Sequence, residues 1–143
     1  MSFSLRPAQL DMLGMTAAVH TAVQRLAEPA GLAFNVSVRG TEPKVHGANA
    51  SVVLRLLQEG LTNSLRHASA SRVDVRLRYL PRGRIAVMLV DDGVGFDKHQ
   101  LLDGEPGELN VGLYGMMERT ELAGGRLHIR TRPGHGVVIR AVL

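Results

Sequence analysis

The chain has 143 residues and a mass of 15.5 kDa, enough for one buried core and too little for a second full domain. It contains no cysteine, so disulfides, zinc ribbons and thiol nucleophiles are excluded. The net charge is +4, yet residues 91–108 hold six carboxylates against one lysine. This polarised charge, with no tryptophan and few other aromatic residues, argues against a protein that stacks nucleic-acid bases.

The hydropathy pattern argues against a membrane span in this chain. The longest purely apolar run, Ile85 to Val90, has six residues, whereas a helix crossing a bilayer needs roughly 20. The composition of the opening residues argues against a signal peptide there. No repeat, low-complexity tract or linker divides the chain. We therefore predict one soluble cytoplasmic domain over residues 1–143, without direct contact to membrane or nucleic acid.

The first part of the chain shows a helical pattern followed by a strand pattern. Apolar residues recur at three- and four-residue steps over residues 7–28, which predicts an amphipathic helix that ends at Pro29 and Gly31. Residues 33–39 alternate between apolar and polar, which predicts a half-buried strand. A short extended piece is expected around Val45.

A second helix and a hairpin are predicted next. Residues 49–67 have apolar residues on so much of the helix that it must be largely buried, and Asn49 or Ser51 is available as its cap. Residues 72–79 alternate strictly, residues 81–83 form a turn, and the apolar run that follows returns as a central strand.

The last part of the chain predicts a loop, a third helix and a second hairpin. The acidic, glycine-rich residues 91–112 read as loop, residues 113–123 as a helix stopped by two glycines, and residues 126–132 and 137–142 as paired strands. Three helices and five or six strands joined by short turns favour a two-layer α/β sandwich. The sheet is expected to be mixed but mostly antiparallel, with the helices on one face.

The second predicted helix carries four polar groups on one face. At 100° per residue, Glu59, Asn63, Arg66 and His67 lie within about 100° of one another around the helix axis. A carboxylate, an amide, a guanidinium and an imidazole aimed together could hold a hydrated cation, orient water and meet phosphate. Taken alone, such a stripe is more often a solvated face.

Two glycine-containing stretches are further candidates. Asp91 ends the predicted central strand, and Gly93 and Gly95 follow it, which lets the backbone approach a flat ligand while the carboxylate accepts from an exocyclic amine. Gly112 and Gly115 are predicted to open the third helix, where free amides can bind an anion. In isolation each is more often an ordinary turn or helix start. Because carboxylates crowd this region, a polyphosphate would need a divalent ion such as magnesium.

The three stretches in this order resemble the motifs of a known superfamily. QEGLTNSLRHA on a helix, DDGVGF after a strand and GLYGMMER at a helix start are similar to the N box and the two glycine boxes of the GHKL, or Bergerat-fold, ATPases. The chain most resembles the catalytic domain of two-component sensor histidine kinases whose response regulators carry a helix-turn-helix. LRPAQLDMLGM and AGGRLHIRTRPGHG extend the resemblance over nearly the whole chain.

The resemblance implies roles for the residues of the helix motif. Asn63 would ligate Mg²⁺, and Glu59, the catalytic residue of the set, would polarise or position a group near the γ-phosphate. Arg66 and His67 would lie beside the phosphates of ATP.

The resemblance also implies how the glycine boxes act. Asp91 would bond the adenine amino group, while Gly93 and Gly95 would leave room for the base. Residues 97–111 would be a short mobile lid, and Gly112 and Gly115 would let the helix start approach the phosphates. Asp92 occupies a variable position and receives no ligand role.

Two positions depart from the family pattern, and one feature of the kinases is missing. Asn110 stands where the subgroup usually has glycine, and Val137 stands where it often has threonine, whose hydroxyl would help the adenine site. None of the six histidines lies in the helical phosphoacceptor setting of the kinases. The resemblance therefore implies a catalytic domain that lacks its dimerisation and phosphoacceptor domain, from a parent protein that can be membrane-anchored.

The implied function is to bind Mg-ATP and to donate the γ-phosphoryl group to a histidine on a separate dimerisation domain, which passes it to a response regulator. A serine kinase of the anti-sigma-factor type is an alternative within the superfamily. A non-catalytic interaction module gated by nucleotide is a second alternative, and a basic nucleic-acid binder is a third.

Overall fold

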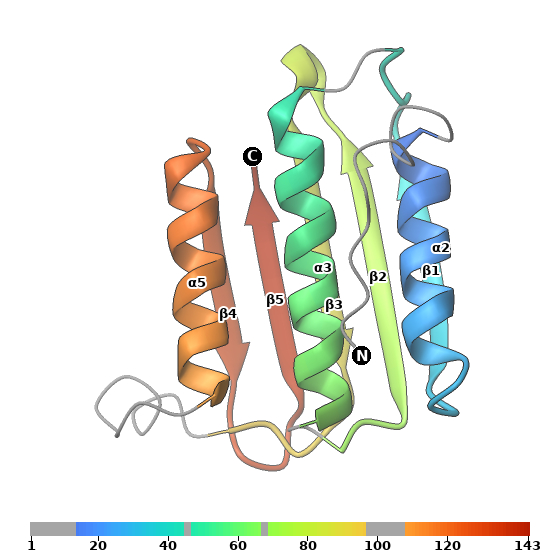
Figure 1. Cartoon of the computed structure of the whole chain (residues 1–143), viewed down its shortest axis with the longest axis vertical. Helices are drawn as coiled ribbons and strands as arrows, with labels where there is room; N and C mark the ends of the chain where they lie inside the picture. The colour runs from blue at the N-terminus through green and yellow to red at the C-terminus, as the bar shows by residue number, and fades with distance from the viewer. Residues whose placement is uncertain (1–13, 45–46, 67–68, 97–107) are drawn as a thin grey trace.

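A five-stranded sheet covered on one face by three helices forms the described part of the chain, residues 14–44, 47–66, 69–96 and 108–143 of a computed structural model (Figure 1). The elements in chain order are α2 (Met15–Ala27), β1 (Ala33–Arg39), α3 (Ala48–Arg66), β2 (Arg72–Tyr79), the short 3₁₀ helix η1 (Pro81–Gly83), β3 (Ile85–Asp91), α5 (Glu108–Leu122), β4 (Arg126–Thr131) and β5 (Val137–Val142).

The sheet has the strand order β1-β2-β3-β5-β4. Its first pair, β1 with β2, is parallel because α3 connects these two strands, and the other three pairs are antiparallel. This confirms the predicted two-layer α/β sandwich with a mixed, mostly antiparallel sheet. The predicted extended piece around Val45 lies outside the described residues.

Strand alternation decides which side chains meet the helices. On β2, Val73, Val75 and Leu77 are buried, and the residues between them face away from the helices. Leu57 and Leu61 of α3 are fully buried and belong to the same core cluster. Each such side chain contributes roughly 1.5–3 kcal/mol when it is removed from water. The core therefore lies between the helix layer and a single face of the sheet.

The start of α2 differs from the predicted helix over residues 7–28. Gly14 has φ 80° and ψ 166°, so the α-helix begins only at Met15, and the predicted residues 7–13 lie outside the described chain. The Glu42 carboxylate accepts a hydrogen bond of 2.6 Å from the backbone N–H of Thr16. An acid that is distant in sequence thus satisfies one of the free amides of the first turn.

The ends of the other two helices also depart from the prediction. Because α3 begins at Ala48, Asn49 and Ser51 lie inside it and neither is its cap. In place of a loop reaching residue 112, α5 begins at Glu108. Gly112 and Gly115 are therefore inside the helix rather than at its opening, and the helical residues whose amides helix geometry leaves free are 108–110. Across the described ranges, no helix is both long and apolar enough to span a bilayer.

Tyr79 joins the sheet to the beginning of α2. Its hydroxyl lies 2.7 Å from Thr16 Oγ1 and donates to Glu42 Oε1 at 2.9 Å. Burial raises the pKa of Tyr79 above its ordinary value; the Thr16 hydrogen bond partly offsets this, and Glu42 adds to it.

We expect Tyr79→Phe to lower the free energy of unfolding by about 1–2 kcal/mol, because the phenol leaves two partly buried polar partners. Urea denaturation measures this change. The control is Tyr114→Phe, since Tyr114 is 47% exposed, and it should shift stability by less than about 0.5 kcal/mol. Equal effects of the two substitutions would contradict the structural role of Tyr79.

Candidate nucleotide-binding site

Asp91 lies buried at the last position of β3, with 7% of its surface exposed. Its Oδ2 accepts a hydrogen bond of 2.8 Å from the Ser64 hydroxyl on α3. Its Oδ1 accepts from the backbone N–H of Gly93 at 3.0 Å and of Val137 at 3.2 Å. The carboxylate is therefore held in one orientation by the helix layer, its own turn and β5. Its oxygens keep further lone pairs, so it can still accept from a ligand.

The turn after Asp91 packs tightly against the β4–β5 hairpin. Gly136 has φ 69°, and a Cβ there would collide with the carbonyl oxygen of Asp91. Gly95 has φ 66°, and a Cβ there would collide with the carbonyl oxygen of Arg132. The Thr131 hydroxyl accepts from the backbone N–H of Phe96 at 3.2 Å and donates to the Gly136 carbonyl at 2.8 Å. Glycine at both positions lets the two backbones touch.

Asp92, the next residue, binds the chain at the start of β2. Its Oδ1 accepts from the backbone N–H groups of Ser71 and Arg72 at 2.8 and 2.9 Å, and its Oδ2 accepts from the Ser71 hydroxyl. The Ser71 and Arg72 hydrogen bonds lower the pKa of Asp92 below its ordinary value of 3.8. Asp92 thus anchors the start of β2.

Glu59 and Asn63 of α3 converge with Gly112 of α5. A Cβ built on Gly112 would lie 3.6 Å from Glu59 Oε2 and 3.9 Å from Asn63 Oδ1. Asn63 Nδ2 is buried and has no hydrogen-bond partner among the described residues. The end of α3, the end of β3 and the start of α5 lie at the same end of the molecule (Figure 1). The two oxygens and the helix backbone therefore face a common region.

Arg119 completes this region from α5. Its Nη2 lies 3.8 Å from Glu59 Oε1, and both side chains are partly exposed. Its Nη1 would lie 3.3 Å from a Cβ added to Gly115, so Gly115 gives the guanidinium room along the helix. At this distance and exposure the ion pair is weak, and an incoming anion can compete for the guanidinium.

The remaining predicted site residues lie at the edge of this region or outside the described residues. Arg66 is exposed in the last turn of α3 and has an interaction partner of its own. His67 and residues 97–107 of the predicted lid lie outside the described residues. Residues 108–111, predicted as the end of the lid, form the first turn of α5.

The donor set fits a magnesium ion that is shared with a nucleotide. Mg²⁺ keeps several waters and takes one or two protein oxygens together with substrate phosphates. Asn63 Oδ1 is such an oxygen, and the described residues contain no cluster of three or more acidic, histidine or cysteine side chains that would make a self-contained cage. These residues therefore suit an ion that arrives with phosphates.

Three residues of this region escaped the sequence prediction. Ser64 lies beside Asn63 within the helix motif, but its bond to Asp91 depends on how α3 packs on β3. Thr131 ends β4 and acts through its hydroxyl on the glycine turn. Arg119 follows Gly115 by one helical turn, and this i, i+4 spacing is the one signal that could have indicated it.

We expect Gly136→Ala to destabilise the domain by about 2–4 kcal/mol, because it adds positive-φ strain to a backbone collision. Gly134→Ala is the matched control. It lies in the same turn at φ 80° with no atom within 4 Å of an added Cβ, so its cost should be about 1 kcal/mol. Thermal and urea unfolding measure both variants, and equal losses would refute close packing at Gly136.

Asp92 should make stability depend on pH in the acid range. Because its folded pKa is depressed, its contribution is present above about pH 4 and is lost as the pH falls through the folded pKa. Asp92→Asn should therefore flatten the fall in melting temperature between about pH 5 and about pH 3. Glu121→Gln, at an exposed helix position, should leave that fall unchanged. An unaltered acid profile in Asp92→Asn would contradict this assignment.

The comparisons with known proteins agree with this geometry. Residues 48–143 match the family described as histidine kinase-, DNA gyrase B- and HSP90-like ATPases. An uncharacterised sensor-like histidine kinase of Chloroflexus aurantiacus is 36% identical over 97% of this chain. The match covers 24% of that relative, so the chain spans about a quarter of its length.

Solved histidine kinases share the fold. The mycobacterial sensor histidine kinase MprB superposes with a TM-score of 0.67 at 23% identity, covering 90% of this chain and 93% of that one. The histidine kinase domain of the blue-light activated kinase of Erythrobacter litoralis EL346 gives 0.64 at 22% identity, covering 90% of this chain and 64% of that one. Together with the matched residues, this means that the chain belongs to the histidine kinase-, DNA gyrase B- and HSP90-like ATPase family.

Proposed function

We propose that this chain is the ATP-binding catalytic domain of a two-component sensor histidine kinase. It binds Mg-ATP and donates the γ-phosphoryl group to a histidine on a separate dimerisation domain. Residues 1–143 then act as one domain of a longer kinase, on the cytoplasmic side, and a response regulator receives the phosphoryl group in a later step. The buried carboxylate of Asp91 is the observation that carries this proposal.

Asp91 is suited to select adenine. A carboxylate that is buried and held by three protein donors loses little further conformational entropy when it accepts a hydrogen bond from an exocyclic amine. Gly93 and Gly95 keep side chains out of the turn that follows. The Val137 departure leaves a contact to Asp91 in place, because Val137 donates through its backbone N–H and not through a side-chain hydroxyl.

Glu59 and Asn63 are suited to the phosphate end of the nucleotide. Asn63 would hold Mg²⁺ through its amide oxygen, and the bound ion would neutralise phosphate charge and orient the γ-phosphoryl group. Glu59 would position a group near the γ-phosphate. Arg119 can break its weak ion pair with Glu59 and bind a phosphate oxygen instead. Arg66, at the end of α3, and His67 are assigned to the phosphate side.

Phosphoryl transfer asks this protein mainly to position groups and to balance charge. Gly112 leaves the space next to Glu59 and Asn63 free of a side chain, which admits the phosphates between α3 and α5. Gly115 gives Arg119 its room beside that space. A nucleotide-gated module without transfer would use the same contacts, so binding alone does not separate the two functions.

Calorimetric titration with ADP or a non-hydrolysable ATP analogue, with and without Mg²⁺, tests the site. Asp91→Asn should weaken binding by about 10- to 100-fold, because a charged acceptor becomes a neutral amide with donors of its own. The adjacent Asp92→Asn is the matched control and should keep affinity within about threefold. Asn63→Asp should change the dependence on Mg²⁺. Equal behaviour of the two aspartate variants, or no saturable binding, would overturn the site.

The chemistry of the product separates the two kinase functions. With γ-labelled ATP and a kinase that retains its helical acceptor domain, transfer to histidine gives an acid-labile phosphate. Transfer to serine, as expected of an anti-sigma-type kinase, gives an acid-stable one. Nucleotide binding without either product would favour the nucleotide-gated module.

A further inference from the structure

The face of the sheet opposite the helices presents aligned rows of side chains. The registers place Arg76 beside Met88, Met88 beside Arg140, and Arg140 beside His128. Since alternate residues of a strand share one face, the row lies opposite the buried side chains of β2 and β3. The α-helices α2, α3 and α5 lie on the other face (Figure 1).

This open face is strongly basic. It is formed by side chains from all five strands, and its arginines are exposed: Arg39, Arg72, Arg76, Arg78, Arg126, Arg130 and Arg140. Among the described residues of these rows, Asp74 is the one carboxylate, and it pairs with Arg72 at 3.1 Å. The other arginines leave an excess of positive charge for a partner.

The middle of the face is apolar. The central strands β3 and β5 contribute half-buried side chains to it: Ala86, Met88, Val90, Val138 and Val142. Arg140 is the one charged side chain that β3 and β5 place on this face, and the other arginines lie on the strands to either side, so a largely apolar centre has a basic rim. Protein interfaces have this composition, with charged residues depleted at the centre and arginine enriched overall.

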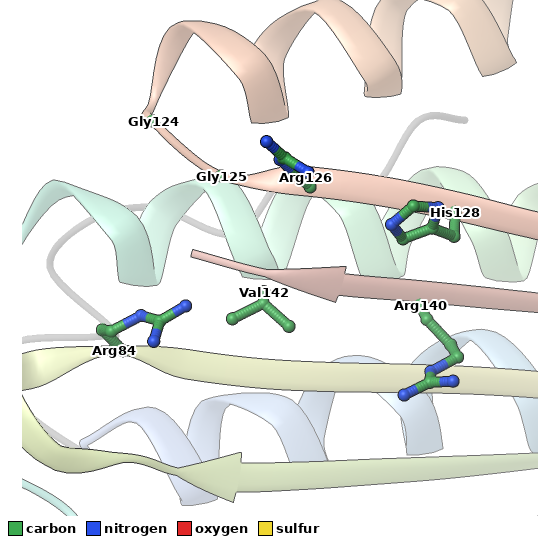
Figure 2. A pocket seen from close by; sticks show the side chains of 7 residues that line it. All are labelled: Arg84, Gly124, Gly125, Arg126, His128, Arg140 and Val142. Atoms are coloured by element: carbon green, nitrogen blue, oxygen red, sulfur yellow. The ribbon is translucent and has the colours of Figure 1, made fainter.

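A hollow of about 480 Å³ opens at one end of the same face. It is lined by Arg84, Gly124, Gly125, Arg126, His128, Arg140 and Val142 (Figure 2). Its charged lining comes from β4, β5 and the residue before β3, and none of its lining residues is acidic. The guanidinium groups offer bidentate donors for carboxylates.

We propose that the open sheet face is a docking surface for an acidic protein partner, whose carboxylates surround an apolar patch and reach into this hollow. A single-stranded nucleic acid fits poorly, because the five described strands place no Phe, Tyr or Trp on this face for stacking bases. A membrane fits poorly because the apolar side chains at the centre are half-buried and are surrounded by arginines. A second copy meeting this face with its own would bring like charges together.

The size of the face sets the expected affinity. Five strands about 4.8 Å apart and six residues long span about 20 Å by 20 Å. That is about half of the roughly 800 Å² that each partner buries in a standard interface. The surface therefore suits a transient contact with a dissociation constant in the micromolar range, steered by charge. It lies on the opposite face from the proposed nucleotide site, so it does not rest on that proposal.

The test uses a synthetic amphipathic helical peptide in which glutamates flank a stripe of leucines. Calorimetry measures its affinity for the domain, and two-dimensional NMR maps the amides whose shifts change. We expect shifts on the four strands β2 to β5 and a weakening of about tenfold or more in the double variant Arg76→Gln/Arg140→Gln. The double variant Arg25→Gln/Arg55→Gln removes the same charge from the helix layer and should keep affinity within about twofold.

Three comparisons can overturn the proposal. A scrambled peptide of the same composition that binds as tightly would show charge attraction without a docking surface. Tighter binding of duplex DNA, or of vesicles containing phosphatidylserine, at the same salt would assign the face to those partners instead. Unchanged affinity in Arg76→Gln/Arg140→Gln with intact folding by circular dichroism would remove the open face from the contact.

Discussion

The buried carboxylate of Asp91 is the contact on which the candidate site depends. It is charged, almost inaccessible to water, and satisfied by donors from α3, from the turn after β3 and from β5. Charge-assisted hydrogen bonds of this kind are roughly twice as strong as neutral ones. They fix the end of the helix layer against the ends of two strands. Glu59 and Asn63 on α3 are thereby brought to the end of the molecule where α5 begins.

Much of the fold could be predicted from local patterns, because the alternation of apolar residues on a strand is a local property. The strands at 72–79 and 137–142 have the expected bounds for this reason. The first residues of the helices were harder to predict from the sequence. Helix α2 begins at Met15 because Gly14 leaves helical geometry and Glu42, far along the chain, supplies the cap. Helix propensity is a local property, so it cannot indicate a capping residue that is distant in sequence.

Within the candidate site, too, local patterns could be predicted from the sequence and contacts between distant residues could not. Motif order was sufficient to single out Asp91, Asn63 and Glu59, since these residues stand at characteristic places relative to a helix and a strand end. The supporting groups are visible only in three dimensions. Ser64 reaches Asp91 across 27 positions of sequence, and Phe96 reaches Thr131 across 35. The prediction of free amides at Gly112 was wrong, because α5 begins one turn earlier and includes residues 108–111.

The arginines of β4 also bear on how copies of the chain meet at high concentration. β4 is an edge strand, and such a strand offers unpaired backbone groups to any other edge. Arg126, His128 and Arg130 alternate along it toward solvent. Two β4 edges brought together would set guanidinium groups against guanidinium groups across the new ladder. The edge is thus protected from sheet extension and aggregation by the electrostatic repulsion of its own side chains.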